Sequence, residues 1–127
     1  MKHHPIQLVK VQIKELQILV NDPAECEKDN LEAQISYRVG SNQFDNEEKV
    51  LMAGFKCLIN TENDNAPFSL VVELIGVFTV SDEFPEDKIE HFARYNAPII
   101  LMPYVRENVY SLACLLYTSD AADERSS

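Results

Sequence analysis

Residues 49–80 read KVLMAGFKCLINTENDNAPFSLVVELIGVFTV, and this stretch decides the fold. It holds two apolar runs, at residues 49–60 and 68–80, separated by the polar residues 61–65. In the first run both alternating sets of positions are largely apolar, which is typical of a central strand buried on both faces. In the second run one set is wholly apolar and the other is mixed, so its second face could meet solvent or a partner. The stretch therefore predicts two strands joined by a turn.

A long strand is predicted upstream, at residues 6–20, which are rich in β-branched and apolar residues. The apolar side of this strand switches near Lys14 and Glu15. Such a shift of one residue is what a β-bulge produces. The strand is expected to end at Asn21-Asp22-Pro23, because Pro cannot donate to a strand ladder and Asn and Asp favour turns.

A further strand is predicted at residues 32–39, where apolar and polar residues alternate without a break. The apolar set of this strand consists of Ala33, Ile35, Tyr37 and Val39. We expect the strand to be half-buried and to end in a turn at Gly40-Ser41-Asn42.

Helices are predicted after the last strand. Residues 81–83, Ser-Asp-Glu, suit a helix N-terminus, where capping and acidic side chains are stabilising, and Pro85 is tolerated in a first turn. The expected apolar stripe of this short helix is Ile89, Phe92 and Ala93. Residues 96–98, Asn-Ala-Pro, are expected to interrupt it.

A second helix is expected near Pro103, with an apolar stripe at the helical spacing of Val105, Val109 and Leu112. Four strands followed by helices, without alternation of strands and helices, predict an α+β domain. We expect the four strands to form an antiparallel sheet.

Length and charge limit the function. The chain has 127 residues, 46% of them hydrophobic, which suits one small domain. Its net charge of −10 argues against a nucleic-acid partner, because a protein that binds nucleic acid needs a basic surface.

No apolar run approaches the ~20 residues that span a bilayer, and no secretory leader is evident, so we expect a cytoplasmic protein without membrane insertion. The three cysteines form no CxxC pair and are expected to be reduced.

No constellation of catalytic or metal-binding residues is evident. His3, His4 and His91 are dispersed along the sequence. Cys57 lies in an apolar strand, and Lys56 is the only basic neighbour that could lower the pKa of its thiol. The three glycines form no phosphate-binding motif. The sequence therefore predicts no enzyme, no metal site and no cofactor.

The predicted strands carry more apolar surface than short helices can cover, so a symmetric partner or a hydrophobic client should bury the remainder. Candidate residues for a client-binding groove are Ala33, Ile35, Tyr37, Leu51 and Phe55. Packing in an ordinary core explains these residues equally well.

Residues 96–112 read NAPIILMPYVRENVYSL. This segment resembles the signature of the SecB export-chaperone family, in which a Pro and an apolar run precede Pro-Tyr-x-Arg-Glu and a later Ser. The stretch Gly76-Val77-Phe78 resembles the family's Gly-Ile-Phe strand end, and residues 8–18 are similar to its first strand.

The resemblance implies an α+β fold in which a four-stranded antiparallel sheet is followed by helices packed on one face. It also implies a homotetramer, a dimer of dimers with helices sandwiched between sheets. It also implies an ATP-independent holdase that binds unfolded or preprotein chains for export. Its motif residues would have structural roles: Pro98, Pro103, Tyr104, Arg106 and Glu107. Pro103 in particular would set the start of a helix.

Two roles remain open under this resemblance. Family members that serve the SecA translocase present acidic residues on the solvent face of the sheet, where Glu73 is the candidate translocase-facing residue here. The alternative is a SecB-like chaperone of a toxin–antitoxin system, with an antitoxin as partner, or an oligomeric interaction module for one dedicated partner.

The C-terminal residues differ in character from the rest. Residues 114–127 read CLLYTSDAADERSS, and the first eleven resemble one reading frame of a transposon-type sequencing adapter. We expect a SecB-like domain at residues 1–113, truncated before the family's final helix, and a non-native tail at 114–127. Without the charged residues of the tail, the net charge becomes −8.

Overall fold

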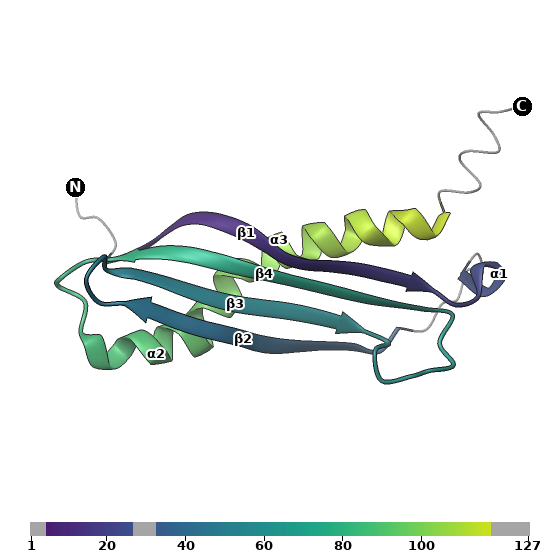
Figure 1. Cartoon of the computed structure of the whole chain (residues 1–127), viewed down its shortest axis with the longest axis horizontal. Coiled ribbons are helices and arrows are strands. Elements are labelled where there is room, and N and C mark those ends of the chain that lie inside the picture. Colours follow the sequence, from purple (N-terminus) through teal and green to yellow (C-terminus); the bar gives the residue numbers. More distant parts are fainter. Residues whose placement is uncertain (1–4, 27–32, 118–127) are drawn as a thin grey trace, which may run out of the picture.

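A computed structural model describes residues 5–26 and 33–117 of the chain. Four antiparallel strands form one sheet, and helices lie against one of its faces (Figure 1). The order across the sheet is β1-β4-β3-β2, which leaves β1 and β2 at the edges. The strand bounds are Ile6–Val20 for β1, Ile35–Asp45 for β2, Val50–Ile59 for β3 and Phe68–Val80 for β4, and a short helix α1, Pro23–Cys26, follows β1. The predicted fold class is confirmed.

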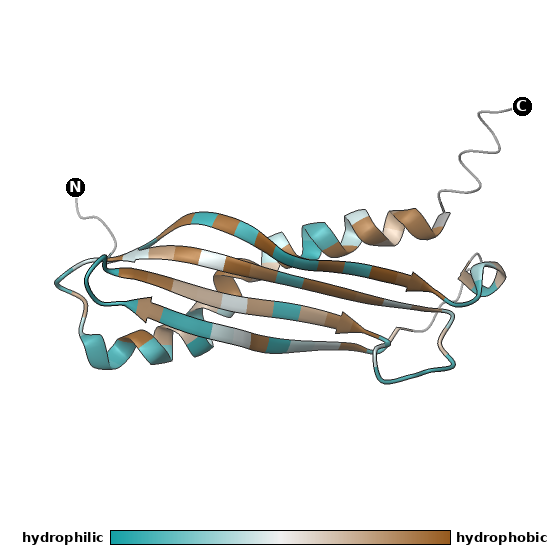
Figure 2. Ribbon diagram, viewed as in Figure 1, coloured by the Kyte–Doolittle hydropathy of each residue, from teal (hydrophilic) through white to brown (hydrophobic). Residues whose placement is uncertain are grey.

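The two central strands are those predicted from residues 49–80. On the helix-covered face, Phe55 lies opposite Leu74 and Leu51 lies opposite Phe78, and all four are buried. Figure 2 shows apolar residues alternating with more polar ones along the strands. The helix-facing set of β4 is buried throughout, as its alternation predicts.

The bulge predicted in β1 is confirmed. The pairing of β1 with β4 shifts by one residue between Ile13 and Glu15, which leaves Lys14 unpaired. A second shift lies between Leu8 and Lys10. Two bulges let a strand of 15 residues follow the twist of the sheet.

The end of β2 differs from the prediction. The strand continues through residues 40–42, where the expected turn is only a register shift between Val39 and Asn42. A side chain at Gly40 would come within 3.2 Å of the backbone of Gly54 on β3, so a glycine pair lets the strands approach closely here. The chain reverses instead at residues 46–49, where Lys49 has a positive φ of 55°.

The prediction that β2 is half-buried is also wrong. Ile35, Tyr37 and Val39 are all exposed. Their alternation is correct, but β2 is an edge strand that the helices do not cover. Sequence alternation indicates which side of a strand is apolar and does not indicate whether another element packs against that side.

The helices form one continuous stretch from Glu86 to Leu116. Its segments are η1 (Glu86–Lys88), α2 (Ile89–His91), the π-helical turn η2 (Phe92–Asn96), α3 (Ala97–Ala113) and η3 (Cys114–Tyr117). The stretch begins later than predicted, because the chain first makes a turn in which the Phe84 N–H donates to the Ser81 carbonyl. By length and composition this stretch would pass as a membrane span, as the core helix of a soluble protein also can.

The expected interruption at residues 96–98 is wrong. The π turn leads directly into α3, and Pro98 occupies its first turn, where no backbone donor is needed. Pro103 does not start a helix, because it lies inside α3. It is tolerated there because the Ile99 carbonyl that loses its donor lies on an exposed side of the helix, where water can replace the bond.

The helices bury the predicted stripes in two core clusters. Ile89, Phe92 and Ala93 pack with Leu51 and Phe78 at one end of the sheet. The other cluster holds residues of β3, β4 and α3, with Val109 and Leu112 packed against it.

The helix sits directly on β4 at Gly76. A side chain there would lie 2.9 Å from Cδ2 of Leu101, so the glycine makes room for α3. Leu116 of η3 also packs on the larger cluster. Residues 118–127, most of the predicted tail, and the histidines His3 and His4 lie outside the described residues.

Candidate functional site

A strip of apolar side chains lies on edge strand β2. We name Ile35, Tyr37 and Val39 the β2 strip; they are 52%, 43% and 40% exposed. They lie opposite Ile59, Cys57 and Phe55 of β3 and therefore share the face on which the helices pack. The facing residues of β3 are buried, whereas the β2 strip itself remains open to solvent.

Tyr37 is the most firmly held residue of the strip. Its ring stacks on Phe55 with centroids 5.7 Å apart, and it forms a side-chain hydrogen bond with Cys57. Burial raises the pKa of the Cys57 thiol above its ordinary value, and the hydrogen bond with Tyr37 acts in the opposite direction. Because Phe55 and Cys57 are themselves buried, the exposed ring of Tyr37 rests on a fixed base.

Of the residues predicted for a client-binding groove, Ile35 and Tyr37 lie on the exposed strip of β2, and Ala33 is exposed just before that strand. Phe55 stacks against Tyr37 but is itself buried in a core cluster. Leu51 does not belong to this surface: it is 1% exposed and packs in the other core cluster, so it is a core residue.

The backbone of the strip also faces outward. The last rung between β2 and β3 joins Gln34 and Asn60, and hydrogen-bonded and non-bonded pairs alternate along an antiparallel ladder. Ile35, Tyr37 and Val39 therefore fall on non-bonded rungs, with their N–H and C=O groups directed away from β3. Apolar side chains and free main-chain groups occur on the same three residues.

Sequence reasoning missed two other apolar surfaces. On the opposite edge strand, Ile13, Leu16 and Val20 are each more than two-fifths exposed. The second surface is a shallow hollow of about 570 Å³, widely open to solvent along the outer side of α3, which we name the α3 groove. Its lining residues are Ile99, Met102, Pro103, Arg106, Glu107 and Tyr110. The signal for the groove was the helical spacing of these residues, in alternating steps of three and one. This spacing is hidden when a helix is expected to begin only at Pro103.

The motif residues lie along α3. Pro103, Arg106 and Glu107 border the α3 groove, and Tyr104 is 41% exposed. The Tyr104 carbonyl accepts a hydrogen bond of 2.8 Å from Asn108 Nδ2. Within the described part of the chain no ion pair involves Arg106 or Glu107, as expected for neighbours in sequence, which point in different directions on a helix.

Glu73 lies on the uncovered face of the sheet. It is only 8% exposed, and its carboxylate lies 3.7 Å from Lys14 Nζ, the residue that the β1 bulge leaves unpaired. Gly40 adjoins the same carboxylate. Little of Glu73 is available to a partner, in contrast to an exposed acidic patch.

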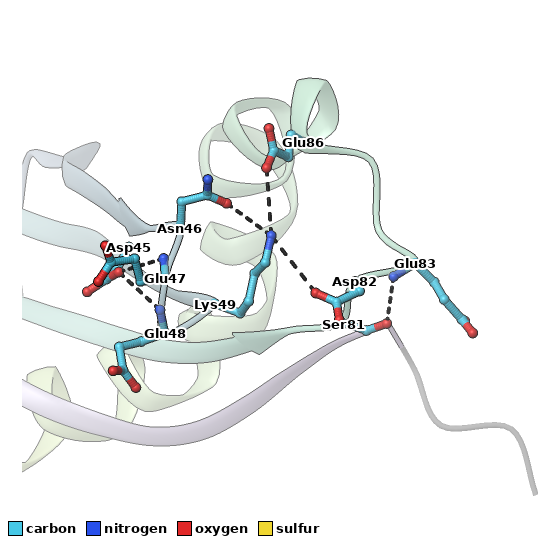
Figure 3. Close-up of polar contacts among 9 residues, drawn as sticks. All are labelled: Asp45, Asn46, Glu47, Glu48, Lys49, Ser81, Asp82, Glu83 and Glu86. Atoms are coloured by element: carbon cyan, nitrogen blue, oxygen red, sulfur yellow. Dashed lines mark hydrogen bonds and ion pairs between the residues drawn. The ribbon is translucent and has the colours of Figure 1, made fainter.

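An acidic cluster lies at the end of the sheet near the β2–β3 turn (Figure 3). Lys49 Nζ donates to Asn46 Oδ1 at 3.0 Å and lies 3.7 Å from Glu86 and 4.0 Å from Asp82. Lys49 thus connects this turn to the segment that leads into the helices. Among residues 5–26 and 33–117, no group of three or more His, Cys, Asp or Glu side chains could hold a metal ion.

The sheet order, the helices on one face and the motif in α3 agree with the family that the sequence resembles. The family model for SecB, described as preprotein translocase subunit SecB, matches residues 1–114. The chain belongs to the SecB family. SecB proteins are chaperones and not a class of enzymes.

Two solved structures are similar to this SecB family chain. One is the SecB-like chaperone Rv1957 of Mycobacterium tuberculosis in complex with a ChAD peptide from the Rv1956 HigA1 antitoxin. It matches with a TM-score of 0.69 and 18% identity, over 88% of this chain and 84% of that one. The other is a protein of unknown function from Streptococcus agalactiae, with a TM-score of 0.32 and 12% identity over 76% and 79% of the chains. No curated protein matched the sequence.

Proposed function

We propose that this SecB family chaperone is an ATP-independent holdase that binds extended segments of unfolded polypeptides on the β2 strip. The observation that carries the proposal is the set of exposed apolar side chains at Ile35, Tyr37 and Val39, which lie beside buried residues of β3 such as Phe55. Covering apolar surface lowers the free energy without consuming a nucleotide. The net charge of −10 keeps the loaded protein soluble.

An aggregation assay tests this function. The full chain, added at a stoichiometric amount, should suppress the light scattering of chemically denatured citrate synthase after dilution. The double variant Ile35→Ser/Tyr37→Ser should lose most of this effect while remaining folded. Failure of the unaltered chain to suppress aggregation would overturn the holdase proposal.

We also propose that the chain assembles as a homotetramer, a dimer of dimers. Exposed apolar residues on β1 and in the α3 groove support this, because a lone protomer would leave them in water. Multi-angle light scattering at micromolar concentration should give the mass of a dimer or a tetramer. A single monomeric species would contradict the proposal.

Two partners are candidates besides general clients. Service to the SecA translocase at Glu73 is less well supported, because Glu73 is almost covered and paired with Lys14. A dedicated antitoxin is the second candidate, since the structurally similar Rv1957 is bound to an antitoxin peptide. An adjacent antitoxin gene, together with saturable binding of a peptide from its product, would favour this role or that of a dedicated interaction module.

We propose further that residues 1–113 are the chaperone domain, that residues 114–127 are an adapter-derived tail, and that the protein acts in the cytoplasm. The abrupt change of composition at Cys114 supports the boundary. Sequencing of the gene across codon 113 from uncloned DNA tests it. A native reading frame through residues 114–127 would overturn it.

A further inference from the structure

Asn60 is a buried polar residue at the end of β3. It is 5% exposed and has a positive φ of 59°, a conformation that Asn tolerates better than most residues. Its hydrogen bonds reach the residue that precedes β2 and the first residue of β4, the two strands that flank β3. Such a buried polar group at a strand end indicates a specific positioning role.

The side chain of Asn60 replaces its own carbonyl in the ladder with β2. The Asn60 N–H donates to the Gln34 carbonyl at 3.0 Å, and the Gln34 N–H donates to Asn60 Oδ1 at 2.9 Å. The Asn60 carbonyl is turned away and accepts from the Asn63 N–H at 3.3 Å. The positive φ makes this exchange possible, because it directs the carbonyl into the following turn while the ladder gains one more rung.

The same side chain also reaches β4. Asn60 Nδ2 donates to the Phe68 carbonyl at 3.2 Å. One amide group therefore ties the start of the edge strand to both central strands. The rung at Gln34 directly precedes Ile35, the first residue of the β2 strip.

We infer that Asn60 is a positioning residue for client binding, because it fixes the backbone register and direction of the β2 strip at its entry. The inference rests on the proposed holdase function. An edge strand has a ladder on one side only, so loss of its terminal rung lets the strand fray from that end. A frayed strip would lose conformational entropy each time that it binds a client, and its affinity would be lower.

The test compares Asn60→Gly with Asn63→Ala in the full chain. Asn60→Gly keeps the positive φ and removes both side-chain bonds. Asn63→Ala is the matched control, since it removes the exposed hydrogen bond that the Asn65 N–H donates to Asn63 Oδ1 in the same turn. Ile89→Val, in the other core cluster, is a second control for simple loss of stability.

Hydrogen exchange gives the first readout. In Asn60→Gly, the amides of Gln34 and Ser36 should exchange about tenfold faster, the size expected from one lost hydrogen bond. Amides in β4 should keep their protection. Equal acceleration throughout the sheet, or no acceleration at Gln34, would overturn the inference whatever the client result.

Client affinity gives the second readout, measured by fluorescence anisotropy with labelled, reduced and carboxymethylated lactalbumin. Under conditions in which every variant is folded, Asn60→Gly should weaken binding about three- to tenfold, and neither control should do so. Equal weakening by Ile89→Val would show a general loss of stability and overturn the inference. If the unaltered chain does not bind the probe, the holdase proposal fails, while hydrogen exchange still decides whether Asn60 fixes the strand.

Discussion

The ring of Tyr37 lies parallel to the ring of Phe55, with 5.7 Å between the centroids and 6° between the planes. The two residues come from neighbouring strands, and one is exposed while the other is buried. Phe55 thus holds an aromatic side chain at the surface in a fixed orientation. This arrangement reduces the side-chain entropy that Tyr37 would lose when a client covers it.

Replacement of Tyr37 by Ser should weaken binding of unfolded lactalbumin about three- to tenfold, because a client can cover only the exposed 43% of a side chain whose full burial is worth roughly 1.5–3 kcal/mol. Fluorescence anisotropy measures the affinity. Arg38→Ser is the control, since Arg38 is the next residue of the same strand and points to the opposite face. An equal loss of affinity in the two variants would contradict client binding on the helix-covered face of β2, because Arg38 lies on the opposite face.

Gly40→Ala should destabilise the protein by about 1–3 kcal/mol through overpacking. The new Cβ would lie 2.9 Å from Glu73 Oε2 and 3.2 Å from the Gly54 backbone. Urea unfolding measures the free energy of unfolding. With Glu73→Ala in the background the cost of Gly40→Ala should be smaller, because one of the two clashes has been removed. Strict additivity of the two substitutions would exclude the contact with Glu73 as a source of the cost.

Cys57 should make stability depend on pH above the neutral range. Burial raises the pKa of its thiol in the folded state above 9.0, so the native state retains a proton that the unfolded state loses. This contribution is complete below the unfolded-state pKa and is lost as the pH rises through the folded-state pKa. In Cys57→Ala the free energy of unfolding should fall less steeply from pH 8 to pH 10 than in the unaltered chain. Identical slopes would contradict the assignment.

Thiol reactivity provides an independent check on Cys57. At pH 8, iodoacetamide should modify the exposed Cys114 well before the buried Cys57, since the thiolate is the reactive form and needs access to the reagent. Peptide mass spectrometry identifies the modified positions. Early modification of Cys57 in the folded protein would mean that its strand opens readily.

Lys49→Met should destabilise the protein by less than about 1 kcal/mol at low salt, because its acidic partners Asp82 and Glu86 are largely exposed. In 1 M NaCl the part of the difference that comes from the two ion pairs should vanish through screening, so that only the loss of the hydrogen bond to Asn46 remains. Thermal unfolding at the two salt concentrations measures both effects. A difference that is equally large at both salt concentrations would indicate that the ion pairs are not its source.

Lys49→Gly separates charge from backbone conformation at this turn. Glycine adopts the φ of 55° without the steric cost that a side chain incurs, so part of the lost stability should return. At high salt this variant should be at least as stable as the unaltered chain. Lower stability under these conditions would contradict the view that the positive φ is strained.

The central sheet could be predicted closely from the sequence because its signal is local. Phe68–Val80 has the predicted bounds, since strict alternation and flanking turn residues mark both ends of β4. The bulge near Lys14 was visible as a switch of the apolar side. Residues 40–42 were misread because Gly-Ser-Asn is a turn signal in isolation, whereas the structure pairs Gly40 closely with Gly54 from another strand.

The candidate site was only partly predictable. Ile35, Tyr37 and their buried neighbour Phe55 are found together, but Leu51 belongs to the core. Exposure of Ile35 depends on how far the helices reach across the sheet, which no local pattern encodes. The α3 groove was missed because Pro98 and Pro103 are helix breakers in local terms, while one lies in a first turn and the other on an open side of the helix.

The π turn at Phe92–Asn96 lies within the buried stripe of the helices. Apolar residues that pack on the sheet recur every fourth position, at Ile89, Ala93, Ala97, Leu101 and Val105. An ideal α-helix repeats every 3.6 residues, so each step of four would rotate the contact by about 40° around the axis. A wider turn absorbs part of this rotation. Deletion of a single residue in the π turn would rotate the following part of the helix about its axis and direct Leu101 and Val105 away from the sheet. This segment should therefore tolerate substitutions far better than changes in length.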